Sequence, residues 1–173
     1  MANFLLELLV VVAAFLDLRR RRIPNWLTVP GMVAGLSINA YQTGWTGLKH
    51  GLLGMLLALV VYGLLFAIHA MGGGDVKLMA AVGAFTGPEA WLSIFAITAV
   101  VGGMLAIITL LTHGGLVRAL GNVAAILGSL GRFRAPHEER PELDVAHPSA
   151  RTLPHGAASA VGVLIYLLWL APG

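Results

Sequence analysis

The sequence predicts an all-α membrane protein, organised as a single domain over residues 1–173. Of these residues 58% are hydrophobic and only 11% are charged, whereas soluble domains carry roughly 25% charged residues. The mean hydropathy is +0.85. The apolar residues also gather in runs separated by short polar segments, which is typical of helices that cross a bilayer.

Composition excludes several classes of function. The chain has no cysteine, which excludes disulfides, thiolate metal sites and a cysteine nucleophile. The net charge is +3, but the arginines flank apolar runs and are not interleaved with aromatic residues, so they indicate membrane topology and not a nucleic-acid partner. The loop histidines, His137, His147 and His155, lack metal-ligand spacing, and we expect neither a metal nor a cofactor. Because the first positive charges follow the apolar run, the N-terminus is not typical of a cleavable signal.

We expect about six membrane-crossing helices, at about residues 3–18, 26–41, 48–70, 76–85, 90–112 and 154–170. The first is short for a crossing, which needs about 20 residues, and it carries Glu7. The four arginines at 19–22 mark its end. Pro24 then disfavours helix at Ile23 and suits the first turn of the next helix.

The connections between these helices are marked by polar and turn-forming residues. Residues 42–47 predict a loop with an interfacial tryptophan, and residues 86–89 contain a Gly-Pro turn. The segment 76–85 is the shortest, so it either crosses fully or is re-entrant. Residues 113–153 predict a cytoplasmic loop, within which 121–130 form an amphipathic interfacial stretch.

The basic residues orient this topology. If the first connection is cytoplasmic, alternation of the crossings places ten of the 11 Lys and Arg residues on the cytoplasmic side and only Lys49 outside. Both termini then face outward. Because the chain crosses twice between Asp17 and Asp75, both carboxylates lie at the cytoplasmic face.

The stretch Gly72-Gly73-Gly74-Asp75 interrupts a long apolar region. A carboxylate in such a region is a functional candidate, because burying it costs free energy. Adjacent glycines allow unusual backbone angles and let another chain come close to the main chain. We therefore predict a broken helix that presents Asp75, with Gly72, Gly73 and Gly74 forming the substrate approach.

Asp17 is the natural partner of Asp75. Two carboxylates held close together share a proton, so one can deprotonate a water molecule while the other protonates a peptide group, which is aspartyl-protease chemistry. Alternatively, Asp17 merely balances the arginines, and Asp75 caps a helix that begins at Val76. Lys77 either supports the charge of Asp75 or marks the inner interface.

These residues resemble those of a known family. Gly72 to Asp75 fit the G-x-G-D signature of intramembrane aspartyl proteases, and the longer run Gly-Gly-Gly-Asp-Val-Lys-Leu resembles the type IV prepilin peptidases. Asp17 followed by Ile23-Pro24-Asn25 is similar to the first-aspartate region of that family. The run from Leu153 to Ala158, Leu-Pro-His-Gly-Ala-Ala, is similar to the start of its final helix.

The resemblance implies an endopeptidase that removes the basic leader peptide from pilin-like precursors at the cytoplasmic face of the inner membrane. Asp17 and Asp75 would be its catalytic pair. Larger members also methylate the new N-terminus and carry an additional cytoplasmic segment with paired cysteines. This chain lacks both the segment and cysteine, so it resembles the short branch associated with Flp-type tight-adherence pili. We expect a Flp-like prepilin substrate, contact with membrane lipid and no methyltransferase activity.

Two other functions remain open from the residues alone, a small proton-coupled transporter and a non-catalytic membrane scaffold of a secretion system. A transporter places its polar groups near the midplane and often has two related halves. Here both acids are expected at one membrane edge, and the sequence has no internal repeat. A scaffold gives the two aspartates no role.

Overall fold

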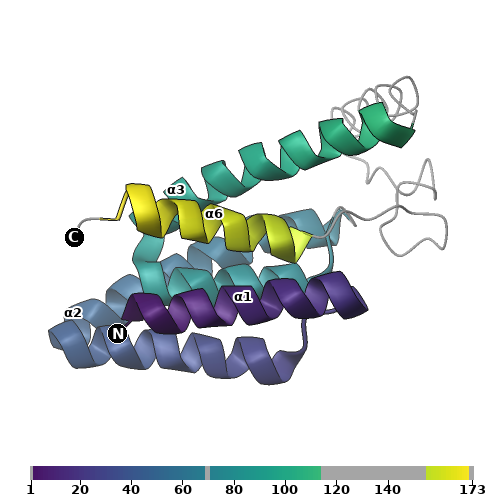
Figure 1. Ribbon diagram of the computed structural model, residues 1–173. Helices are drawn as coiled ribbons and strands as arrows, with labels where there is room; N and C mark the ends of the chain where they lie inside the picture. The colour runs from purple at the N-terminus through teal and green to yellow at the C-terminus, as the bar shows by residue number, and fades with distance from the viewer. Residues whose placement is uncertain (1, 69–70, 114–154, 172–173) are drawn as a thin grey trace.

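The computed structural model describes residues 2–68, 71–113 and 155–171. Its elements, in order, are the helices α1 (Ala2–Arg20), α2 (Asn25–Ala67), α3 (Gly73–His113) and α6 (His155–Trp169). They lie side by side in a bundle, with both termini at one end and the C-terminal part of α3 diverging from the rest (Figure 1). The all-α class is thus confirmed. Apart from His113, the predicted cytoplasmic loop and its amphipathic stretch lie outside the described residues.

The prediction of six separate membrane-crossing helices is not supported. Among the described residues only α2 and α3 are long and apolar enough to cross a membrane. Helix α6 has 15 residues, fewer than the roughly 20 of a crossing, and α1 carries two acids and two arginines. Helices α2 and α3 run through the two predicted connections, because only Thr43 and Gly44 in α2 and Gly87 in α3 leave helical backbone angles.

Helix α2 turns sharply at its break. Gly44 has a positive φ of 63°, a conformation that costs glycine little because it has no Cβ. The chain then returns close enough for Gly47 to lie against the backbone carbonyl of Asn39. The Asn39 amide in turn donates to the carbonyl of Ala84 at 2.9 Å, which attaches the part of α2 just before its break to α3.

Helix α3 also folds back on itself. Gly87 has a φ of 75°, and the His50 imidazole lies where a side chain at position 87 would be. Beyond the break, the Trp91 indole N–H donates to the Met79 carbonyl at 3.1 Å. A straight helix would separate these residues by about 18 Å, so the hydrogen bond requires the sharp bend.

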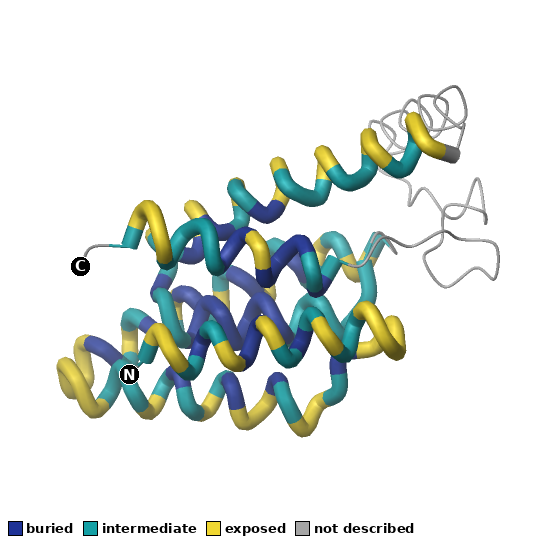
Figure 2. Tube along the Cα trace, viewed as in Figure 1, coloured by how far each residue is buried: buried dark blue, intermediate teal, exposed yellow. Residues whose placement is uncertain are grey.

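The core surrounds the part of α3 that follows Asp75. Residues 78–82 are fully buried, and they belong to the dark central part of the bundle (Figure 2). Helix α2 approaches this segment closely, because the backbones of Gly54 and Gly83 are in contact. Asp75 is therefore close in sequence to a fully buried segment of α3.

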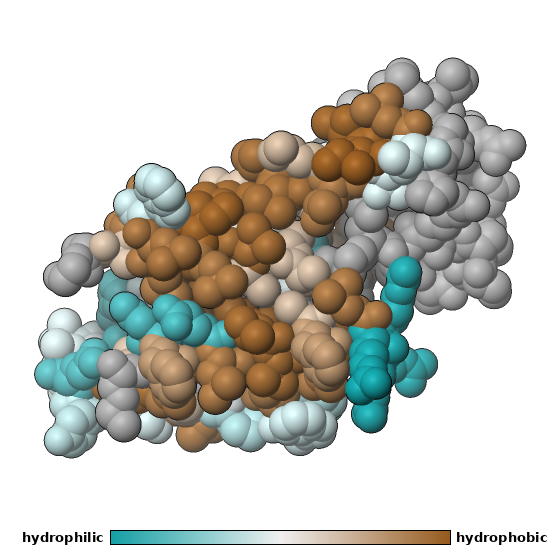
Figure 3. Space-filling model, in the orientation of Figure 1, coloured by the Kyte–Doolittle hydropathy of each residue, from teal (hydrophilic) through white to brown (hydrophobic). Residues whose placement is uncertain are grey.

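The outer surface is largely apolar. Large hydrophobic side chains are exposed along the helices, and they form the broad brown area in Figure 3. A strongly hydrophilic group lies at the end of the bundle where α1 ends (Figure 3). An exposed apolar area of this extent, together with two helices of membrane-crossing length, indicates a membrane protein.

Candidate active site

Asp17 lies in the last turn of α1 and is half-buried. The helix ends just after it, where the Arg21 N–H donates to the Asp17 carbonyl at 2.8 Å. Arg21 itself has a φ of 50°, a left-handed conformation that turns the chain away from the helix axis. The basic residues in the last turn also complement the negative end of the helix dipole. The sequence thus ends α1 at the point where Asp17 faces the start of α3.

Asp75 lies in the first turn of α3 and is also half-buried. Helix α3 begins at Gly73, so the proposal that Asp75 caps a helix beginning at Val76 is wrong. The Asp75 N–H donates to the Gly72 carbonyl at 3.1 Å, which closes the first turn. A carboxylate in this turn is favoured by the positive end of the helix dipole.

The two aspartates line the same pocket, which has a volume of about 250 Å³. Its other lining residues come from the end of α1, the α1–α2 connection and the start of α3: Arg21, Arg22, Ile23, Gly72, Gly73 and Gly74. A water molecule occupies about 30 Å³ in the liquid. The pocket that both carboxylates line therefore has room for a water molecule and part of a peptide backbone.

The three glycines face different neighbours. A Cβ on Gly74 would lie 3.2 Å from the Cβ of Ile23 and 3.4 Å from its backbone nitrogen. One on Gly73 would lie 3.5 Å from the Phe66 ring, and one on Gly72 would lie 3.5 Å from the Asp75 carboxylate. Gly74 has the tightest surroundings of the three, and it separates Asp75 from the α1–α2 connection.

Lys77 makes a hydrogen bond to the neighbouring helix. Its Nζ donates to the Asn25 side-chain oxygen at 2.8 Å, and Asn25 is the first residue of α2. Lys77 does not line the pocket. This contact joins the starts of α2 and α3, whereas a direct role for Lys77 at Asp75 stays a prediction.

Two site residues that the sequence analysis did not select lie at the start of α6. The Gly156 N–H donates to Oδ2 of Asp17 at 2.9 Å. His155, which the sequence placed among the loop histidines, is the first residue of α6, and its Nε2 is hydrogen-bonded to the Tyr62 hydroxyl at 3.2 Å. The sequence signal for these two residues is the Pro-His-Gly run at 154–156, which predicts only the start of a helix.

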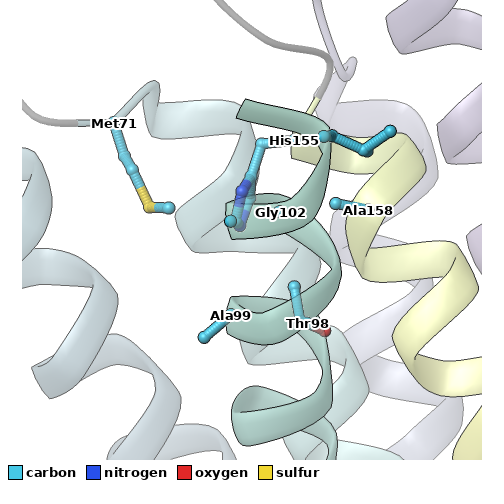
Figure 4. A pocket seen from close by; sticks show the side chains of 8 residues that line it. Met71, Thr98, Ala99, Gly102, His155 and Ala158 are labelled. Atoms are coloured by element: carbon cyan, nitrogen blue, oxygen red, sulfur yellow. The ribbon is translucent and has the colours of Figure 1, made fainter. Parts of the chain in front are cut away.

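A second pocket, of about 220 Å³, lies beside this start of α6 (Figure 4). It is mainly apolar, and its lining comes from α3, α6 and the residue before the glycines: Met71, Thr98, Ala99, Gly102, Gly103, Leu105, His155 and Ala158. Met71 directly precedes Gly72, and His155 directly precedes Gly156. In the sequence, Met71 of this pocket thus adjoins the glycines of the carboxylate pocket, and His155 adjoins the residue that donates to Asp17.

Other sequence candidates lie away from the carboxylate pair. Glu7 is ten residues before Asp17 on α1, about 15 Å along the helix axis, and it does not line the pocket. Within residues 2–68, 71–113 and 155–171, no three His, Asp or Glu side chains form a cluster that could hold a metal ion.

The apolar helices and the pocket at their end define an α-helical membrane protein in which two carboxylates from different helices line one pocket. The chain belongs to the type IV leader peptidase family. The model of that family matches residues 4–107, which is more than half of the chain and includes both aspartates. The resemblance stated from the sequence is confirmed.

The names of three similar proteins give two activities, a leader peptidase and an N-methyltransferase. The chain is 31% identical over 113 residues to a prepilin leader peptidase/N-methyltransferase of Myxococcus xanthus. This alignment covers 61% of this chain and 33% of that protein. For the enzymes of the same name from Xanthomonas campestris and Klebsiella pneumoniae, identity is 33% over 116 residues and 38% over 92 residues. The first alignment covers 63% of this chain and the second 50%, and each covers 40% of the relative. The chain thus spans between a third and two fifths of these relatives. No solved structure matches it.

Proposed function

We propose that the protein is a membrane aspartyl endopeptidase that removes the basic leader peptide from type IV pilin-like precursors. One observation carries this proposal: Asp17 and Asp75, from two different helices, line one pocket beside the three glycines. The family match and the names of the relatives support the same substrate class.

The pocket suits peptide hydrolysis by two carboxylates. One aspartate takes a proton from a water molecule as its oxygen bonds to the scissile carbonyl carbon, while the other gives its proton to the carbonyl oxygen. When the C–N bond breaks, the first aspartate gives the proton it took from water to the leaving nitrogen, and the second aspartate regains a proton from a hydroxyl of the tetrahedral intermediate. The products are a leader with a new carboxylic acid group and a mature chain with a new amine, and the aspartates end, as they began, with one proton between them.

The charges around the pocket support a location at the cytoplasmic face of the inner membrane. Arg21 and Arg22 line the pocket, and Lys77 lies two residues after Asp75. Basic residues beside membrane helices are retained on the cytoplasmic side. We therefore infer that the protein is a multi-pass membrane peptidase of the Flp-like branch. It acts on a precursor that is held in the same bilayer.

The test is cleavage of a co-expressed pilin-like precursor, followed by gel shift. Asp17→Asn and Asp75→Asn should each lower the cleavage rate by at least about a hundredfold, because each removes a proton carrier with little change of shape. Combining the two substitutions should not restore activity. Glu7→Gln is the matched control, since it neutralises an acid of α1 that does not line the pocket.

Membrane levels of each variant show whether the protein still inserts. Loss of cleavage at normal membrane levels in both aspartate variants, with activity retained in Glu7→Gln, is the expected result. Substantial cleavage by either aspartate variant would contradict the proposed pair.

A further inference from the structure

The first turn of α6 contributes to the active site through a backbone group. Gly156 is the second residue of that helix and is buried. Its N–H donates to Oδ2 of Asp17 at 2.9 Å, across 139 positions of sequence. Asp17 thus accepts a hydrogen bond from a helix to which it does not belong.

This hydrogen bond uses a donor that α6 cannot satisfy by itself. The first N–H groups of a helix have no carbonyl partner within the helix, and the dipole makes this end partially positive. A carboxylate is the complementary partner for both features. The Gly156 N–H thus binds Oδ2 of Asp17, while the Asp17 side chain lines the pocket.

A side chain at position 156 would crowd Asp17. A Cβ there would lie 2.9 Å from Oδ2 of Asp17, 3.0 Å from its Cβ and 3.2 Å from its Cγ. Contacts this short would push the carboxylate away from its present place. The absence of a side chain is therefore a requirement of the Asp17 position.

The backbone N–H of Gly156 is also held in place through the residue that precedes it. His155, the residue before Gly156, is hydrogen-bonded to the Tyr62 hydroxyl at 3.2 Å. Tyr62 is buried and packs edge-on against Trp91 and Phe95, with ring centroids 6.1 and 5.8 Å away. The start of α6 is thus attached to an aromatic cluster formed by α2 and α3. Helix α3 also carries Asp75.

We propose that Gly156 is the positioning residue for Asp17: its backbone N–H holds one carboxylate oxygen, and its lack of a side chain leaves room for Asp17 to face Asp75. This inference rests on the proposed peptidase function. It adds a third element, the first turn of α6, to a site that the sequence predicted from α1 and the start of α3.

The N–H can be removed without changing the shape of the residue. Cell-free synthesis into nanodiscs can place glycolic acid at position 156, which replaces the backbone N–H with an ester oxygen. We expect kcat for precursor cleavage to fall about tenfold or more, since a hydrogen bond to a charged group is lost, while KM changes less than twofold. An ester at Val163, buried in the same helix, is the control and should leave kcat within about twofold.

A pair of side-chain variants tests the steric requirement. Gly156→Ala crowds Asp17, whereas Gly162→Ala crowds Thr98 of α3 from the same helix. We expect Gly156→Ala to lose at least about tenfold in kcat, and Gly162→Ala to lower the melting temperature in detergent with kcat within about threefold. Melting curves of all variants show that they remain folded.

Wild-type cleavage and its loss in Asp17→Asn establish the activity in the same nanodisc preparation. Full kcat in the ester enzyme, or equal kcat losses in the two alanine variants, would overturn the role of Gly156 and leave the proposed function intact. Failure of the wild-type enzyme to cleave in any precursor assay would instead overturn the proposed function and, with it, this inference.

Discussion

Gly74 separates Asp75 from the α1–α2 connection, and its neighbours leave little space for a side chain. A Cβ there would meet the backbone nitrogen and oxygen of Ile23 at 3.4 and 3.5 Å. Ile23 is itself buried, and it directly follows the arginines of the pocket. A larger side chain at position 74 would therefore crowd both the Ile23 side and the Asp75 side of the pocket.

We predict that Gly74→Val lowers the initial rate of precursor cleavage by at least about tenfold, because the branched side chain displaces Ile23 or the first turn of α3. Gly103→Val is the control, since nothing lies within 4 Å of a Cβ at that position, and it should change the rate less than about twofold. Rates are measured by gel shift at equal membrane levels. Equal rates in the two variants would show that the glycine break is merely a turn.

At the scale of elements, the packing of α2 against α3 determines where Asp75 lies. Gly54 of α2 and Gly83 of α3 bring their backbones into contact, and a Cβ on either would meet the backbone of the other. Small residues at such crossings let membrane helices approach closely. The contact lies two turns beyond Asp75, in the buried part of α3.

We predict that Gly54→Ala lowers the free energy of unfolding by about 1–3 kcal/mol, because its methyl group meets backbone atoms that cannot rotate away. Gly63→Ala is the matched control on the same helix, where a Cβ has no neighbour within 4 Å. It should leave stability unchanged or slightly higher, because alanine favours helix over glycine. Unfolding in detergent measures both, and similar losses in the two variants would contradict the close crossing.

At the scale of the whole molecule, both aspartates lie at one end of an apolar bundle. A catalytic pair at this depth can reach only a bond that is held at the same depth. A leader that carries Lys or Arg stays on the cytoplasmic side, with the following apolar helix in the bilayer. The proposed function thus requires the scissile bond to lie between leader and helix.

We predict that moving the cleavage junction of the precursor several residues into its apolar helix prevents processing, although the scissile residues are unchanged. The bond would then lie deeper in the bilayer than the pocket of Asp17 and Asp75. Cleavage is measured in reconstituted membranes, with a precursor of unshifted junction as the control. Efficient cleavage of the shifted junction would mean that depth does not select the bond.

Much of this site was predictable from local sequence. Asp17 and Asp75 were identifiable because an acid in an apolar run is costly and rare, and the glycines because three in succession interrupt a helix pattern. The structure places these residues in one pocket. Composition likewise determined the all-α class, because runs of apolar residues in a membrane must satisfy their backbone hydrogen bonds internally.

Tertiary structure decided the features that depend on packing between distant residues. The predicted connections at 42–47 and 86–89 became sharp breaks within α2 and α3, since one or two residues suffice to turn a helix when the partner helix holds both sides. Lys77 binds Asn25 at 2.8 Å, although its nearest acid in sequence is Asp75. The Gly156 N–H binds Asp17 because α6 packs between α1 and α3. No local sequence pattern predicts which carboxylate the start of a helix will face.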